Sequence, residues 1–131
     1  MFCLSSPDKS IEAFLGSYDR IAVCGGFMTG KTAVTDHIHD RFVYHTDKMP
    51  HSRILACCQS APRWVIVGDT AHEIAEAAGA QAIVHCTRGR VEPRGHPDKP
   101  PRRYDPYHLK RKREIDAAIE AIPLPRYESQ L

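Results

Sequence analysis

A short apolar run that leads into a glycine-rich loop constrains the fold of this 131-residue chain more than any other feature. Residues 20–24, "RIAVC", are typical of a buried parallel strand, because such a strand is apolar on both faces. The next eight residues are "GGFMTGKT", in which Gly25, four free positions, Gly30, Lys31 and Thr32 have the spacing of a phosphate-binding loop. This spacing is informative because it lies between a predicted strand and a predicted helix.

The chemistry of such a loop follows from its residue types. Glycines let the backbone curl until successive N–H groups face one anion, and the following helix directs its positive dipole end to the same point. Lys31 is expected to bridge the β- and γ-phosphates of a nucleotide, and the Thr32 hydroxyl to ligate Mg²⁺. A purely structural glycine-rich turn is the alternative. The predicted cofactor-binding set is Gly25, Gly26, Phe27, Met28, Thr29, Gly30, Lys31, Thr32 and Ala33.

Helical and extended patterns alternate along the chain. Helices are expected over residues 6–18, 31–39, 50–61, 70–79 and 107–122, and strands over 20–24, 41–46, 63–68 and 81–86. The last residues, "PLPRYESQL", are interpreted as an irregular tail. The alternation predicts a single α/β domain over residues 1–131, with a short, mainly parallel sheet of four to five strands and helices on both faces.

Polar and glycine residues follow each predicted strand. Right-handed crossovers place the carboxyl ends of parallel strands at one sheet edge, where ligands of open α/β sheets bind. The residues at these ends are Gly25, Asp47, Gly68–Asp69 and Cys86–Arg88. We therefore expect one site at this edge.

Composition and charge narrow the setting. The five cysteines contain no CxxC pair, the longest apolar runs are too short to cross a bilayer, and the first residues do not have the pattern of a signal peptide. A cytoplasmic protein without a membrane partner is expected. Net charge is only +2, but ten Lys or Arg residues lie between 88 and 113. This excess indicates either a polyanionic partner or a solvated basic face.

Four segments carry a resemblance to a known family: "GGFMTGKT", "YHTDKMPHSR", "WVIVGDT" and "TRGRVEPR". The chain resembles the nucleoside-monophosphate-kinase-like branch of P-loop kinases over about residues 20 to 120. Within that branch it is most similar to polynucleotide 5′-hydroxyl kinases and to phage kinases acting on hydroxymethylpyrimidines in DNA. The resemblance implies a three-layer P-loop NTPase fold, ATP and Mg²⁺, and γ-phosphate transfer to a hydroxyl of DNA or of a nucleotide. A phage or bacterial host cytoplasm would fit such an enzyme.

The resemblance also implies roles for acidic and basic residues before the fourth strand. Asp47 matches the carboxylate that orients and deprotonates the attacking hydroxyl, although it could instead be a turn or helix-cap residue. Arg53 matches a substrate-phosphate arginine only loosely and could be a surface residue. Asp69 matches a residue lining the acceptor pocket, and helix capping or a second-sphere Mg²⁺ role are its alternatives. His72 could face the same cleft, but a surface position is preferred.

The arginines after the fourth strand match the family's lid, which we place at about residues 87–106. Arg88 and Arg90, with Arg94 behind them, are the residues expected to stabilise charge on the transferring phosphoryl group. Gly89 and Gly95 could act as hinges. A disordered basic loop is the alternative interpretation.

Two parts of the family pattern are thin in this chain. No fifth strand is recognised after Arg113, so a four-stranded core is expected in which a second subunit, as in a dimer, could help complete the adenine site. The basic run "LKRKRE", with Tyr104 and Tyr107, could follow a DNA backbone or could be a solvated helix face. A metabolite kinase, a nucleotide-binding regulatory module without an acceptor, and a non-catalytic nucleic-acid-binding protein remain as alternatives.

Overall fold

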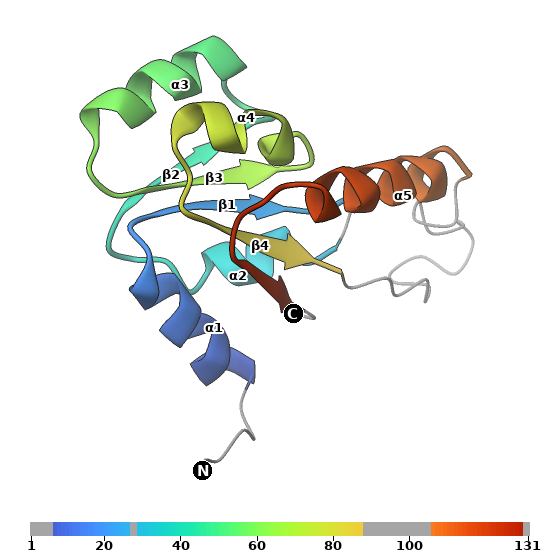
Figure 1. Cartoon of the computed structure of the whole chain (residues 1–131), viewed down its shortest axis with the longest axis horizontal. Helices are drawn as coiled ribbons and strands as arrows, with labels where there is room; N and C mark the ends of the chain where they lie inside the picture. The colour runs from blue at the N-terminus through green and yellow to red at the C-terminus, as the bar shows by residue number, and fades with distance from the viewer. Residues whose placement is uncertain (1–6, 27–28, 88–105, 130–131) are drawn as a thin grey trace, which may run out of the picture.

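Helices and strands alternate through most of the chain in the computed structural model, which describes residues 7–26, 29–87 and 106–129 (Figure 1). The helices are α1 (Pro7–Ser17), α2 (Lys31–Thr35), α3 (His51–Ser60), α4 (Ala71–Ala78) and α5 (Pro106–Glu120). The strands are β1 (Arg20–Cys24), β2 (Phe42–His45), β3 (Trp64–Gly68), β4 (Ala82–Cys86) and β5 (Arg126–Ser129). The expected α/β class is confirmed.

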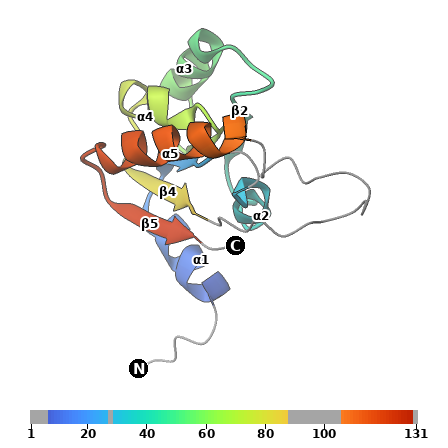
Figure 2. The ribbon, with the colours of Figure 1, turned by 90° about the vertical axis from the view of Figure 1, so that its right-hand side faces the viewer.

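The five strands form one parallel sheet in the order β2-β3-β1-β4-β5. The central strand β1 pairs with both β3 and β4, so that Cys24 lies opposite Gly68 on one side and His85 on the other. All strands therefore end at the same edge, which Figure 2 shows facing the viewer. The expected convergence of the strand ends is confirmed for the residues that the structure describes.

Helices cover both faces of the sheet and form three layers (Figure 1). Alternate residues of β1 point to opposite faces, because successive side chains of a strand do so. Ile21 and Val23 pack with α1 and α2, whereas Ala22 and Cys24 pack with α3, α4 and α5. The strands β1, β3 and β4 are thus buried on both faces, which explains their uninterrupted apolar sequences.

The chain's last segment corrects our interpretation of an irregular tail. It forms β5, which pairs in parallel with β4 so that Ile83 lies opposite Arg126 and Cys86 opposite Ser129. This edge strand lacks an apolar run because Arg126 and Glu128 are exposed, and its prolines precede the strand instead of interrupting it. The sheet has five strands, at the upper end of the expected four to five, and the expectation of a four-stranded core was wrong.

The helix after the glycine-rich loop is also shorter than predicted. It ends at Thr35 instead of continuing to residue 39, and the N–H groups of His37 and Ile38 bond three residues back. Thr35 directs its hydroxyl to the carbonyl of Thr32 at 2.9 Å. Such local bonds, with Asp and His residues of low helix propensity, favour an early end.

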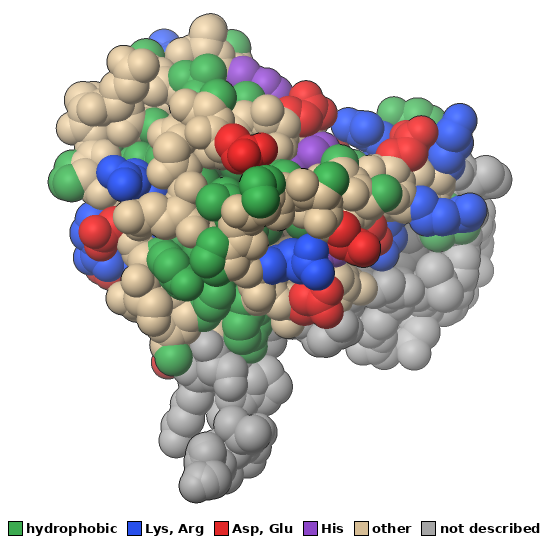
Figure 3. Space-filling model, in the orientation of Figure 1, with side chains coloured by type: hydrophobic (Ala, Val, Ile, Leu, Met, Phe, Trp, Pro, Cys, Tyr) green, Lys and Arg blue, Asp and Glu red, His purple; other side chains and the backbone are tan. Residues whose placement is uncertain are grey.

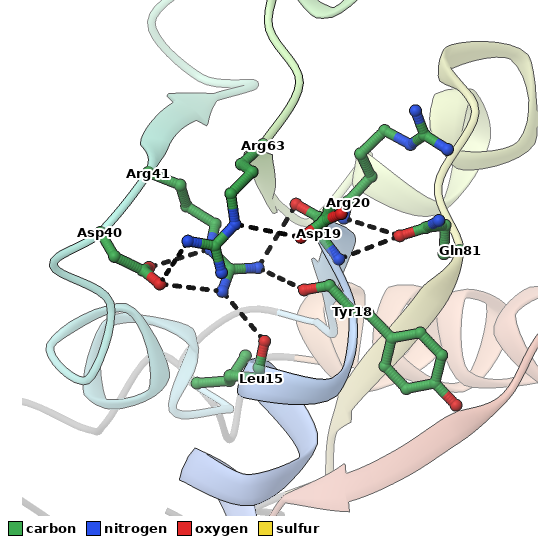
Figure 4. A network of polar contacts seen from close by, with 8 residues as sticks. All are labelled: Leu15, Tyr18, Asp19, Arg20, Asp40, Arg41, Arg63 and Gln81. Carbon is green, nitrogen blue, oxygen red and sulfur yellow. Dashed lines mark hydrogen bonds and ion pairs between the residues drawn. The ribbon is translucent and has the colours of Figure 1, made fainter.

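At the edge of the sheet where the strands begin, Arg41 connects the start of β2 to the end of α1 by hydrogen bonds (Figure 4). Its side chain is only 2% exposed. The guanidinium donates hydrogen bonds to the carbonyls of Leu15 (3.0 Å) and Tyr18 (2.7 Å) and to both carboxylate oxygens of Asp40. This hydrogen bonding lowers the pKa of Asp40. One planar cation therefore satisfies carbonyls at a helix end that would otherwise lack partners.

The Arg41→Lys variant tests this contact. An ammonium group keeps the charge but cannot reach two carbonyls and both carboxylate oxygens together, so the free energy of unfolding should fall by about 1–3 kcal/mol. Urea unfolding followed by circular dichroism measures the loss. Arg113→Lys, at an exposed position on α5, is the control and should leave stability unchanged. Equal midpoints for the two variants would contradict the assigned role.

Candidate functional site

The glycine-rich loop leaves β1 at the centre of the sheet edge, and its backbone is packed too closely for side chains. A Cβ atom on Gly25 would lie 2.5 Å from Thr29 Oγ1 and 2.7 Å from the carbonyl oxygen of Cys86 in β4. Thr29 is buried and donates its hydroxyl to the carbonyl of Gly26 at 2.9 Å. Gly30 has the left-handed backbone at the N-cap of α2, with φ 95°. The loop's glycines are thus required by its geometry.

Lys31, the first residue of α2, turns back over this loop. Its Nζ donates to the carbonyl oxygens of Gly25 (3.2 Å) and Gly26 (2.5 Å). Burial lowers the pKa of Lys31. The negative charge of Asp69 opposes this lowering most strongly, and the charge of Asp47 also opposes it. The structure therefore brings both candidate carboxylates within electrostatic reach of the loop lysine.

The carboxylates themselves lie in turns and do not cap helices. Asp47 is exposed in the turn after β2, where the N–H groups of Lys48 and Met49 bond to the carbonyl of His45. The N-cap of α3 is Pro50, and α4 begins at its N-cap Thr70 without a side-chain capping bond. The helix-cap alternatives for Asp47 and Asp69 are therefore not realised.

Polar groups that the sequence did not reveal lie at the ends of β2 and β3 and at the starts of α3 and α4. A Cβ on Gly68 would meet Thr46 Oγ1 at 1.8 Å, so the threonine occupies the space that the glycine leaves. His51 Nε2 lies 2.9 Å from Thr70 Oγ1. Thr46 Oγ1 and His72 Nδ1 are buried without a hydrogen-bond partner. These contacts join residues that are distant in the sequence, so only the three-dimensional structure shows them.

His72 is less exposed than the surface position preferred from the sequence. It lies in the first turn of α4, half-buried, and burial lowers its pKa. The charges of Glu73 and Asp69 oppose the shift, and that of Arg111 adds to it. Burial therefore favours the neutral form of the His72 imidazole.

A second missed group joins β4 to α5, the helix that lies over β4 in Figure 2. His85 is 2% exposed, and its Nε2 lies 2.8 Å from Asp116 Oδ1. The other carboxylate oxygen of Asp116 accepts a hydrogen bond from Lys112 Nζ at 2.7 Å. A histidine inside the otherwise apolar "AIVHC" strand was the available sequence signal for this group.

The remaining predicted site residues are placed less centrally or lie outside the described residues. Arg53 is exposed on α3, Thr32 is exposed on α2, and Ala33 is half-buried there. Phe27, Met28 and the lid arginines Arg88, Arg90 and Arg94 belong to the undescribed segments. The same holds for most of the predicted lid over 87–106.

The thiols near the loop are not nucleophiles. Burial raises the pKa of Cys86 to about 12, and burial also strongly raises that of Cys24. Both cysteines are buried in the sheet and stay protonated at neutral pH, which agrees with small hydrophobic side chains.

Charged side chains of both signs gather over α5 on the face shown in Figure 3. In the described part of the chain, no three His, Cys, Asp or Glu side chains are grouped to hold a metal, and no helix is long and apolar enough to span a membrane. No protein-family model, curated protein or solved structure matches this chain.

The Gly68→Ala variant tests the contact between β3 and Thr46. The new Cβ has no room at φ +151°, so the free energy of unfolding should fall by about 2–4 kcal/mol. Adding Thr46→Ala removes the hydroxyl and should restore part of that loss. Gly16→Ala is the matched control, because nothing lies within 4 Å of its added Cβ and alanine is favoured in a helix. Thermal unfolding ranks the four proteins, and a Gly68→Ala protein as stable as wild type would refute the contact.

Proposed function

We propose that this chain is a P-loop phosphotransferase that transfers the γ-phosphate of ATP to a hydroxyl group of DNA or of a nucleotide. The supporting observation is Lys31. Its ammonium group rests on the carbonyls of Gly25 and Gly26, inside a loop of the phosphate-binding spacing. A cation held over such a loop can form charge-assisted hydrogen bonds with a phosphate chain bound there.

Topology supports the location of the site. The connection leaving β1 leads toward β2, on the β3 side, whereas the connection leaving β4 leads toward β5 on the other side. The point between two adjacent strands whose connections diverge is where open α/β sheets bind ligands. The glycine-rich loop begins at this point, and Gly25 lies against the end of β4.

The residues fit a nucleotide with Mg²⁺. The backbone of Gly25 leaves no space for a side chain, as expected where a loop must curl closely, and Lys31 is available for the β- and γ-phosphates. Bound Mg²⁺ would supply charge neutralisation on the phosphates, with the Thr32 hydroxyl as its protein ligand. In such sites Mg²⁺ keeps waters and phosphate oxygens as ligands, so a cage of protein carboxylates is not needed.

In this proposal the carboxylates act on the acceptor. Asp47 accepts the proton of the attacking hydroxyl, because it is exposed at the sheet edge and within electrostatic reach of Lys31. Asp69 keeps Lys31 charged against the effect of burial and lines the acceptor side. Arg88 and Arg90 are the proposed lid arginines.

An acceptor presented on a large molecule suits the exposure of Asp47 and the basic surface of α5, with Lys110 and Arg113 exposed. A 5′-hydroxyl end or a hydroxymethylated base are the acceptors favoured by the resemblance. A metabolite hydroxyl is the alternative acceptor.

The Asp47→Asn variant tests the proposed base. Transfer of labelled γ-phosphate should fall about 10²- to 10⁴-fold, because the amide cannot accept the proton, whereas ATP binding should persist. The acceptor panel comprises 5′-hydroxyl DNA, hydroxymethylpyrimidine DNA, nucleosides and small alcohols. Asp36→Asn, at an exposed position after α2, is the control and should retain transfer. ATP binding with every acceptor unlabelled by wild type would favour a regulatory module instead.

The Lys31→Met variant tests nucleotide binding separately. Loss of the ammonium group should weaken ATP affinity about 10- to 100-fold, the range for a hydrogen bond to a charged group. Calorimetric titration in the presence of Mg²⁺ measures it, and Lys48→Met, exposed in the turn after β2, is the charge-matched control. Unchanged affinity in Lys31→Met would exclude the phosphate-loop interpretation.

A further inference from the structure

Lys112 occupies an unusual position for a lysine. It lies three residues before Ile115 and seven before Ile119, the two buried residues with which α5 packs into the core. Residues at these spacings share one helix face, so Lys112 lies on the face directed to the sheet. Its side chain is 24% exposed, whereas Lys110 and Arg113 on the same helix are exposed.

This face brings Lys112 against the glycine-rich loop. A Cβ atom on Gly26 would lie 3.0 Å from Cα, Cβ and Cγ of Lys112, so glycine is what lets α5 approach the loop. Gly26 is also the residue whose carbonyl accepts the hydrogen bond from Lys31. The ammonium group of Lys31 and the first carbons of the Lys112 side chain therefore both lie against Gly26.

The side chain of Lys112 is held from behind. Asp116, one helical turn later, accepts its hydrogen bond at 2.7 Å and contacts buried His85 at 2.8 Å with the other oxygen. The Nδ1 atom of His85 is buried without a partner. An ammonium group carries three donors, so the bond to Asp116 leaves Lys112 with two for another acceptor.

We propose that Lys112 is a second cationic ligand for the phosphate chain at the glycine-rich loop, and that Asp116 and His85 position it. The inference rests on the proposed function, because it needs a polyphosphate at the loop. Lys31 binds the phosphate chain from within the loop, and Lys112 binds it from α5. Asp116 prevents Lys112 from extending into solvent, so less conformational entropy is lost when phosphate binds.

The test is calorimetric titration of wild type and variants with ATP and with inorganic tripolyphosphate, which carries the phosphate chain without a nucleoside. Lys112→Gln should weaken both ligands about 10- to 100-fold, and Lys112→Arg should recover most of the affinity because it keeps the charge. Lys110→Gln is the control for charge. Two residues along a helix correspond to about 200° of rotation, so Lys110 faces away from Lys112. Lys110 belongs to the surface proposed for the acceptor and not to the loop, so its loss should leave the affinities for ATP and for tripolyphosphate unchanged.

Asp116→Asn tests positioning. It should weaken tripolyphosphate binding less than Lys112→Gln does, and it should add no further loss in the Lys112→Gln background. Thermal unfolding without ligand is measured for every variant. A lower unfolding temperature in Lys112→Gln with unchanged tripolyphosphate affinity would mean that the group only fastens α5 to β4, and it would overturn the proposal.

The outcomes also separate this inference from the proposed function. Loss of affinity in Lys31→Met but not in Lys112→Gln would refute the role of Lys112 and leave the phosphotransferase proposal intact. Tripolyphosphate binding that depends on both lysines, with no acceptor labelled, would support Lys112 and refute phosphate transfer. A wild-type protein that binds neither ligand would refute both.

Discussion

The parallel pairing of β1 with β3 and with β4 is the interaction on which the candidate site depends. It fixes Cys24 between Gly68 and His85, and so determines which residues stand beside the loop that begins at Gly25. The carbonyl of Cys86 lies where a side chain on Gly25 would otherwise extend. A shift of β4 by one residue would turn His85 to the opposite face and remove it from Asp116. The register of the sheet therefore determines the geometry of the candidate site.

The electrostatics at the loop follow from this packing. Lys31 loses hydration by burial, which lowers its pKa, and it compensates with hydrogen bonds to two neutral carbonyls. Phosphate oxygens are stronger partners for an ammonium group than carbonyls are, because those hydrogen bonds join two charged groups. A phosphate chain would therefore be a stronger partner for Lys31 than the loop carbonyls are, and the charge of Asp69 opposes the lowering of the lysine pKa by burial.

The sequence predicted most of the fold but only part of the site. The strands β1, β3 and β4 were recognisable because burial on both faces demands uninterrupted apolar runs. The edge strand β5 was not, because its burial alternates and its pairing with β4 is a long-range property. Lys31 could be predicted as a candidate because its signal is a local spacing in the sequence. The contact of His85 with Asp116 could not be predicted, because it joins residues 31 positions apart and leaves no local pattern.

Buried polar groups lie at both edges of the sheet. At the amino edge Arg41 is nearly inaccessible, yet it is surrounded by carbonyls and by Asp40, as a stabilising residue should be. Of the five buried side-chain atoms that lack hydrogen-bond partners in the described residues, three belong to Thr46, His72 and His85 at or near the carboxyl edge. The other two belong to Arg20 and Trp64, which begin β1 and β3 at the amino edge. Buried polar groups without partners cost stability, so the three at the carboxyl edge are the groups that a ligand bound there could satisfy.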